Sequence, residues 1–389
     1  MLRERGFVVG AGRRGTRVAP RPALRAPGPG GSPPPAPARA DLSIGLADPA
    51  LLPPIAAALA RIDLDAKLRV SRLEAADPDL LDAARTGFEA DGVRSDALAV
   101  VSGAMDGVER VLGAHLRPGD RAIVEDPCYP PIRDVLLALG LVPIPVAVDD
   151  SGLIPDLFAA ALHRGAQAVV TVPRAQNPLG AAVDEQRAGE LRALLAAHAD
   201  VLIVEDDHAS VVAGSPFRSL ADSSWPRWAV IRALSKILHP DLRVALVAGD
   251  ATTIARVEGR QALGPRWVSH ILQATAAELL LDAGFDEVVT HARHVYAARR
   301  DALIGALADH GVPAHGRSGL NVWVPLREEA PVARALLDEG WLVSAGELFR
   351  FASGPGIRVT TATLDVADAP EVAAVIAAIE HAGRSRRAY

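Results

Sequence analysis

The chain has 389 residues, of which half are hydrophobic and 23% are charged, with a formal net charge of −6. This balance is typical of a globular protein with enough material for two or three domains, and no apolar run approaches the ~20 residues of a membrane span. The single cysteine, Cys128, excludes an intramolecular disulfide framework, and the net negative charge argues against a chain that binds polyanions along its whole length. The N-terminus is rich in arginine but lacks the apolar core of a secretory signal, so we expect a cytoplasmic protein.

The first eighteen residues predict a short β-hairpin. Residues 7–9 and 16–18 are β-type runs, and the glycine-rich stretch between them carries two arginines at the expected turn. The pattern resembles the wing of a GntR-type winged helix-turn-helix domain, whose recognition helix we would then expect before residue 1; the alternative is a frayed basic tail. Residues 19–40 are rich in proline and glycine and predict a linker with a tethered module on each side.

From residue 41 onward, the apolar spacing predicts strands that alternate with helices. The expected strands are residues 97–101, 121–124, 142–146, 168–172, 201–204, 229–231 and 244–248. The expected helices are residues 53–62, 79–90, 104–116, 132–139, 156–164 and 185–198, then 267–281 and 285–308. This alternation predicts a mostly parallel sheet with helices on both faces. After residue 313, strands 319–324, 341–344 and 357–361 with helices 330–339 and 369–382 predict a smaller α+β domain.

Polar and aromatic residues follow several of these strands, and ligands of parallel sheets gather at the carboxyl ends of strands. Gly103 opens a helix whose first free amides, those of Ala104 and Met105, suit a phosphate group. Tyr129 could stack on a flat ring, although packing is an equal alternative. Asn177 lies in an Asn-Pro-Leu-Gly loop and could donate to a ring oxygen, unless the loop is an ordinary turn.

Acidic residues end the strand at 201–204, where Glu205, Asp206 and Asp207 would be costly to bury without a positive partner. Both a Mg²⁺ site and a carboxylate that pairs with a pyridinium nitrogen fit this cluster, and the residues alone leave the choice open.

Lys236 is one of only two lysines in a chain that otherwise uses arginine. A primary amine can condense with a carbonyl, whereas a guanidinium cannot. With Ser235 beside it and Arg243 seven residues on, Lys236 suits a phosphorylated aldehyde; the alternative is a surface lysine. Arg358, on a later strand, could bind a carboxylate through two hydrogen bonds, with a salt bridge as its alternative.

The order of these residues is more specific than any one of them. Taken together, these residues resemble the site of a fold-type I pyridoxal phosphate-dependent aminotransferase of the class I/II family. The set consists of Gly103, Tyr129, Asn177, Asp206, Ser235, Lys236, Arg243 and Arg358. The resemblance covers about residues 41 to 385, and with the wing and linker the chain resembles a MocR-type regulator of the GntR family. It implies an α/β fold with a partial wing at 1–18, a linker at 19–40, a large cofactor-binding domain with an N-terminal arm at 41–288 and a small C-terminal domain at 289–389.

The resemblance also implies roles. Lys236 would hold pyridoxal 5'-phosphate as an internal aldimine and move the substrate proton, Asp206 would pair with the pyridine nitrogen, and Arg358 would bind the substrate α-carboxylate. The implied cofactor-binding set is completed by Gly103, Ala104, Met105, Tyr129, Asn177, His208, Ser235 and Arg243. His208 stands where many relatives have tyrosine, and residues 68–76 lack the tyrosine that relatives send to the partner subunit's cofactor.

The implied function is amino transfer from an amino acid to a 2-oxo acid, in a homodimer and without a metal. The alternatives are an effector-sensing domain of a MocR/GntR-type transcriptional regulator with little or no turnover, which would contact DNA only through its winged helix, and a non-catalytic remnant.

Overall fold

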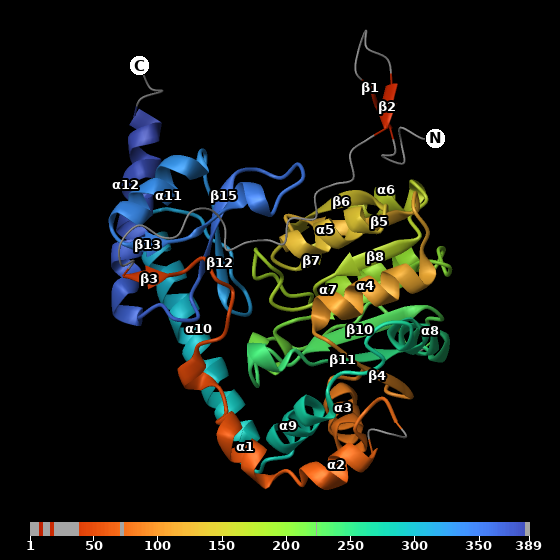
Figure 1. Ribbon diagram of the computed structural model, residues 1–389. Helices are drawn as coiled ribbons and strands as arrows, with labels where there is room; N and C mark the ends of the chain where they lie inside the picture. The colour runs from red at the N-terminus through yellow and green to blue at the C-terminus, as the bar shows by residue number, and fades with distance from the viewer. Residues whose placement is uncertain (1–7, 11–15, 19–38, 71–73, 223, 386–389) are drawn as a thin grey trace.

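The computed structural model describes residues 8–10, 16–18, 39–70, 74–222 and 224–385. Its centre is an eight-stranded sheet flanked by helices, and a second, smaller group of strands and helices lies beside it (Figure 1). Among the described residues, no helix is long and apolar enough to cross a membrane.

The large sheet is mostly parallel, as predicted. In spatial order its strands are β4 (Ala97–Val101), β11 (Ala245–Gly249), β10 (Trp228–Ala233), β9 (Leu202–Asp207), β8 (Ala168–Thr171), β5 (Arg121–Asp126), β6 (Val142–Asp149) and β7 (Gly152–Leu153). The five strands from β10 to β6 pair in parallel, β11 is antiparallel to both of its neighbours, and β7 is antiparallel to β6. Every residue of β9 and β10 is buried, which is why their first parts, residues 202–204 and 228–231, are continuous apolar runs rather than alternating ones.

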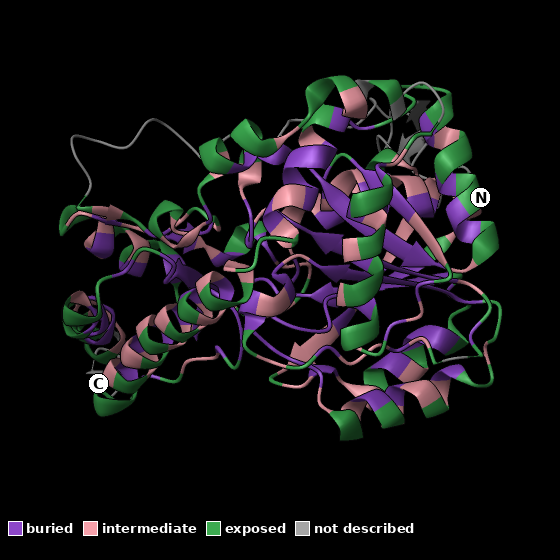
Figure 2. Cartoon of the chain, turned by 90° about the horizontal axis from the view of Figure 1, so that it is seen from below, coloured by how far each residue is buried: buried purple, intermediate pink, exposed green. Residues whose placement is uncertain are grey.

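Two hydrophobic cores lie on opposite faces of this sheet. Successive strand residues point to opposite faces, so Val169 and Ile203 join one core while Val170 and Val204 join the other. The first core is covered by α3 (Pro78–Ala90), α6 (Pro155–His163), α7 (Glu185–Leu195) and α9 (His270–Leu280), and the second by α4 (Ala104–His115), α5 (Pro130–Ala138) and α8 (Ala251–Ala262). Figure 2 shows the buried strands between helices whose outer turns are exposed.

The smaller α+β part follows the long helix α10 (Phe285–Asp309). Its three antiparallel strands are β12 (Asn321–Pro325), β15 (Gly356–Thr360) and β14 (Ser344–Ala345), and they pack with α11 (Glu329–Asp338) and α12 (Ala369–Ser385) around a third core. The predicted boundary after residue 288 falls inside α10, and the division into domains stays a prediction.

The chain segment that follows the linker is fastened to this smaller part. β3 (Ala40–Asp41) pairs in parallel with β13 (Trp341–Leu342), and Arg39 forms ion pairs with Asp368 and Glu371 while its guanidinium lies 4.6 Å from the ring centroid of Trp341. From there the chain runs along the molecule to α1 (Ile55–Arg61) and α2 (Leu64–Val70) at its far end (Figure 1).

Several elements differ from those expected. The sequence pattern assigned nothing to α2 or α8, although Asp250, whose side chain accepts from the amide of Thr253, is a typical N-cap for α8. The strand expected at 341–344 is two strands, β13 and β14, with different partners. At the N-terminus, β1 (Val8–Gly10) and β2 (Thr16–Val18) pair in antiparallel fashion as expected, while the turn between them and linker residues 19–38 lie outside the described residues.

Candidate functional site

Lys236 lies three residues beyond the end of β10 and is buried, with 9% of its surface exposed. Its ammonium nitrogen donates to the backbone carbonyl of Gly45, in the segment that follows β3. Burial disfavours the charged ammonium and lowers the pKa of Lys236 to about 8; the charge of Arg358 acts in the same direction and that of Asp206 opposes it. A buried amine with a lowered pKa does not fit the alternative of a surface lysine.

The two adjacent acids at the end of β9 have opposite environments. Asp207 accepts hydrogen bonds of 2.8 Å from Arg174 and from Arg232, and despite its burial these guanidinium groups hold its pKa far below the usual range. Asp206 is equally buried, and its Oδ1 has no hydrogen-bond partner. Burial, with the charges of Asp207 and Glu125, raises the pKa of Asp206 to about 7.

The other two acids of this region are fully engaged. Glu205 accepts hydrogen bonds from the hydroxyl of Ser219 and the amide of Leu220, and Glu125 accepts from Thr171, the amide of Val172 and Gln176. The part of the chain that the structure describes contains no group of three His, Cys, Asp or Glu side chains that could hold a metal ion. The Mg²⁺ alternative therefore has no ligand set there, and the unpartnered oxygen of Asp206 favours the pyridinium alternative.

Arg358 on β15 is 4% exposed and reaches the same space from the smaller part of the molecule. Its guanidinium donates to Oδ1 of Asn177 over 3.1 Å, to the hydroxyl of Ser344 over 3.2 Å and to the carbonyl of Ser43. These acceptors are all neutral, and none of the ion pairs formed by the described residues involves Arg358. The salt-bridge alternative is thus unsupported, and burial lowers the pKa of Arg358 to about 10.

Asn177 has a donor left for a ligand. A guanidinium only donates, so the atom of Asn177 that faces Arg358 is the amide oxygen, and the NH₂ group is directed elsewhere. This leaves Asn177 with the donor that the predicted contact to a ring oxygen requires.

The expected phosphate-binding residues converge at the start of α4. Gly103 caps this helix with a φ of 92°, and a Cβ built on it would lie 2.5 Å from Nη2 of Arg243. The guanidinium of Arg243 therefore covers the glycine next to the free amides of Ala104 and Met105, where both the helix dipole and the cation favour an anion. Ser235 is half-buried and immediately precedes Lys236.

Tyr129 precedes α5 and lies within the electrostatic reach of both ends of the site. Its pKa is raised by burial and by the charge of Asp206, while the charges of Arg358 and Arg243 act in the opposite direction. Tyr129 thus lies near Asp206, near Arg358, which is expected to bind a carboxylate, and near Arg243, which is expected to bind a phosphate.

The hydrogen bonding of His208 differs from the donor role that was expected for it. Its Nε2 lies 2.8 Å from the carbonyl oxygen of Ala175, which can only accept, so Nε2 carries the proton. Burial and the charge of Lys236 lower the pKa of His208 to about 4, which makes the ring neutral near pH 7. In this conformation the remaining nitrogen, Nδ1, is an acceptor, whereas the expectation was a donor to a ring oxygen.

Some residues of the site were absent from the sequence-based set. Ser43 and Gly45 contribute backbone carbonyls, which every residue possesses, so no side-chain motif could have revealed them. Arg232 carries a detectable signal, since an arginine that directly follows the apolar run of β10 predicts a buried ion pair. Arg174 lies in the segment after β8 and carries no such signal.

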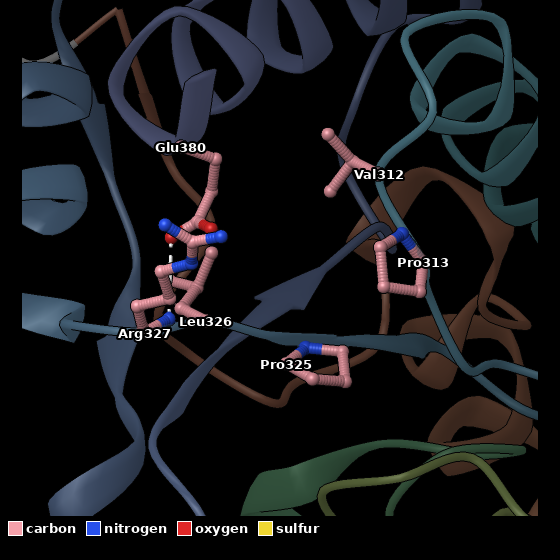
Figure 3. A pocket seen from close by; sticks show the side chains of 6 residues that line it. All are labelled: Val312, Pro313, Pro325, Leu326, Arg327 and Glu380. Carbon is pink, nitrogen blue, oxygen red and sulfur yellow. Dashed lines mark hydrogen bonds between the residues drawn. The ribbon is translucent and has the colours of Figure 1, made fainter. Parts of the chain in front are cut away.

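A cavity of about 250 Å³ lies elsewhere, in the smaller part of the molecule. Its lining residues are Val312, Pro313, Pro325, Leu326, Arg327 and Glu380 (Figure 3). The amide of Arg327 donates to the carboxylate of Glu380 over 3.2 Å, and these two residues lie together on one side of the cavity (Figure 3). None of the predicted site residues lines this cavity.

The main site combines a buried amine with a lowered pKa, an unpartnered buried carboxylate, an amide donor, an anion-binding helix start and a buried guanidinium. These groups complement, in turn, an aldehyde, a pyridinium nitrogen, a phenolic oxygen, a phosphate and a carboxylate. The residues present therefore fit pyridoxal phosphate together with an amino acid.

Comparisons with known proteins agree with this chemistry. A family model described as aminotransferase class I and II matches residues 46–376. The vitamin B6 salvage pathway transcriptional repressor PtsJ of Salmonella typhimurium is 38% identical over 339 residues, which are 86% of this chain and 78% of that protein. The mitochondrial kynurenine/alpha-aminoadipate aminotransferase of Bos taurus is 28% identical, over 62% of this chain and 62% of the enzyme.

A solved structure shows the same fold. The kynurenine aminotransferase of Pyrococcus horikoshii, crystallised in complex with PMP, superimposes with a TM-score of 0.80 over 88% of this chain and 91% of its own, at 22% identity. The chain therefore spans nearly all of this archaeal enzyme, 78% of the repressor and about three fifths of the bovine enzyme.

Proposed function

The chain belongs to the class I and II aminotransferase family, and from that premise we propose that it transfers the amino group of an amino acid to a 2-oxo acid, with Lys236 as the residue that binds pyridoxal 5'-phosphate. The observation that carries the proposal is the pair of Lys236 and Asp206. In a site where the neighbouring acids are all hydrogen-bonded, Asp206 alone keeps an unpartnered buried oxygen next to a buried amine.

Pyridoxal phosphate, when bound, supplies an electron sink that stabilises negative charge at the substrate Cα. Asp206 would hold the proton of the pyridine nitrogen, because a buried carboxylate gains most from a cationic partner. Lys236, with a pKa of about 8, is partly neutral near physiological pH and can accept the proton from Cα.

The remaining residues would bind and orient. Arg243 and the first amides of α4 would hold the phosphate, Asn177 would donate to the ring oxygen, and Tyr129 would stack on the ring. Arg358 would bind the α-carboxylate, because a carboxylate is a stronger acceptor than the neutral groups that now engage the guanidinium.

The second candidate is an effector sensor. It is favoured by the 38% identity with a transcriptional repressor and by the paired strands β1 and β2, which fit the wing of a DNA-binding domain. In this role the same site would bind cofactor and amino acid with little or no turnover, and a winged helix would contact DNA. A homodimer fits both candidates, and a cytoplasmic location stays a prediction.

A spectral titration separates the two functions. The purified chain is loaded with pyridoxal phosphate and titrated with each standard amino acid while the visible absorption band is followed. An aminotransferase converts the band to that of the aminated cofactor and regains it when a 2-oxo acid is added. A sensor shifts the band without this conversion. A chain that shows no visible band with the cofactor would refute both.

A further inference from the structure

Asp126, at the carboxyl end of β5, is a buried acid that the proposed chemistry does not use. Its carboxylate reaches across to a loop of the smaller part of the molecule and accepts hydrogen bonds from three consecutive amides. Their lengths are 2.9 Å from Phe351, 2.8 Å from Ala352 and 2.9 Å from Ser353, and the hydroxyl of Ser353 adds a fourth bond of 2.8 Å. Both carboxylate oxygens are thus engaged by one loop.

A second contact fastens the beginning of the same loop. The amide of Cys128 donates to the carbonyl of Phe349 over 2.8 Å. Residues 126–128, at and just after the end of β5, therefore lie alongside residues 349–353 of the loop, although more than 220 positions separate them in the sequence.

The loop packs against Arg358, the residue expected to bind the substrate carboxylate. The guanidinium carbon of Arg358 lies 4.8 Å from the ring centroid of Phe349, which is itself 3% exposed. The ring of Trp323 meets that of Phe349 edge-on, with centroids 6.3 Å apart. A cation over a buried aromatic face is favourable, and the ring limits the orientations that the guanidinium can adopt.

The segment fixed by Asp126 also leads to the cofactor side of the site. Tyr129, the side chain expected to stack on the cofactor ring, follows Asp126 by three residues and is the N-cap of α5. The contacts of Asp126 therefore join the segment that would face the cofactor to the loop that supports Arg358.

We propose that Asp126 is a positioning residue for substrate binding: by holding residues 349–353 it keeps the ring of Phe349 beneath Arg358 and so sets the affinity for the α-carboxylate. The inference rests on the proposed function, because it takes Arg358 as the group that binds the substrate carboxylate. Asp126 itself touches neither substrate nor cofactor in this assignment.

The test compares two ligands in the loaded, full-length protein. One is the standard amino acid that shifts the visible band most, and the other is its α-amide, which keeps the amine and side chain but lacks the carboxylate. In Asp126→Asn the amide group has the shape of the carboxylate but places a donor against the loop amides. We expect the half-saturating concentration of the amino acid to rise about tenfold, which corresponds to ~1.4 kcal/mol, and that of the amide to stay unchanged.

A second variant guards against misfolding of the first. Phe349→Leu keeps the bonds of Asp126 but removes the ring, and it should weaken binding of the amino acid and not of the amide. If Asp126→Asn does not fold, this variant decides alone. Asp134→Asn is the control, since this half-buried acid on α5 forms a 3.7 Å ion pair with Arg133 and is not bonded to the loop; it should match the parent.

Each outcome bears on a different claim. Equal weakening of both ligands, or no change in either, would overturn the positioning role and leave a purely structural contact. If the parent protein shows no visible band with pyridoxal phosphate, the proposed function fails and the inference fails with it. If the parent binds cofactor and amino acid but both variants behave as the parent does, only the inference is lost.

Discussion

At the cofactor end of the site, Gly103 and Lys236 follow strands of the large sheet and Asp206 lies near the end of another. At the carboxylate end, Arg358 is held by residues from three regions of the chain, near positions 43, 177 and 344–349. The first three positions are fixed by β4, β9 and β10, which are hydrogen-bonded into one buried layer. Arg358 is contacted by Ser43, Asn177, Ser344 and Phe349. The cofactor end is therefore set by the sheet, and the carboxylate end by tertiary contacts between loops.

The two ends also differ in charge. At the cofactor end the unsatisfied group is an acceptor, Oδ1 of Asp206, which is ready for a cation. At the carboxylate end the central group is a cation whose partners are neutral, so an incoming carboxylate would replace weaker acceptors such as the carbonyl of Ser43. This difference indicates that the cofactor end is ready for its ligand, while the carboxylate end must exchange contacts when substrate binds.

The largest effect should come from the amine at the cofactor end. Lys236→Ala removes the only buried lysine of the described residues, and we expect complete loss of the visible band that pyridoxal phosphate produces. Lys67→Ala is a matched control, because the other lysine of the chain pairs with Asp77 and Asp79 away from the site. Borohydride reduction followed by peptide mass mapping should place the cofactor on Lys236; label on Lys67, or a band that survives in Lys236→Ala, would contradict the assignment.

The next prediction is that substitutions of the two adjacent acids of β9 affect different properties, catalysis for Asp206 and stability for Asp207. Asp206→Ala should leave cofactor bound but slow amino transfer by at least about 10²-fold, the size typical of a lost electrostatic contact in an active site. Asp207→Ala should instead lower the free energy of unfolding by ~3–5 kcal/mol, because it leaves Arg174 and Arg232 without their buried partner. Single-turnover kinetics and thermal unfolding of both variants measure the contrast. Undiminished transfer in Asp206→Ala would refute its role.

Removal of the cation tests the carboxylate end directly. Arg358→Ala should weaken amino acid binding by ~2–5 kcal/mol if the guanidinium and the substrate carboxylate form a buried charge pair. Loading with pyridoxal phosphate should change less, because among the groups expected to bind the cofactor only Asn177 forms a hydrogen bond with Arg358. Titration of the visible band with amino acid gives both quantities, and an unchanged affinity would return Arg358 to a structural role.

The unpartnered carboxylate of Asp206 also predicts that the stability of the ligand-free protein depends on pH. The pKa of Asp206 is raised to about 7 by burial, so between its ordinary pKa near 4 and about 7 the folded state binds more protons than the unfolded state. The contribution of Asp206 to stability is therefore present below this window and is lost as the pH rises through it, by a few kcal/mol. Buried Glu125 and Glu205, whose pKa values are also raised to about 7, contribute in the same window. Asp206→Asn should therefore make the decline of the unfolding temperature between pH 4 and 7 less steep, and a profile parallel to that of the parent would contradict the raised pKa of Asp206.

The same contrast explains what the sequence could and could not predict. Lys236, Asp206 and Gly103 follow apolar runs that are recognisable as strands, and parallel strands bring their carboxyl ends to one edge, so the pattern alone predicted that these residues lie near one another. Their roles toward a cofactor came from the family resemblance and stay predictions. The supports of Arg358 include the backbone carbonyl of Ser43 and a loop docked by Asp126, contacts that exist only after the two parts of the chain have packed together. The proton of His208 was likewise unpredictable, because it depends on the carbonyl of Ala175.

The smallest effect should come from the glycine at the phosphate end. Gly103→Ala places a methyl group 2.5 Å from Nη2 of Arg243 and strains a backbone with a φ of 92°, so the guanidinium must move away from the start of α4. Because the amides of α4 and Lys236 remain, we expect affinity for pyridoxal phosphate to fall by only about tenfold, or ~1.4 kcal/mol. Gly189→Ala is the control, since a Cβ there would meet no atom within 4 Å. Equilibrium titration with pyridoxal phosphate measures the difference, and equal affinities in the two variants would remove Arg243 from the phosphate site.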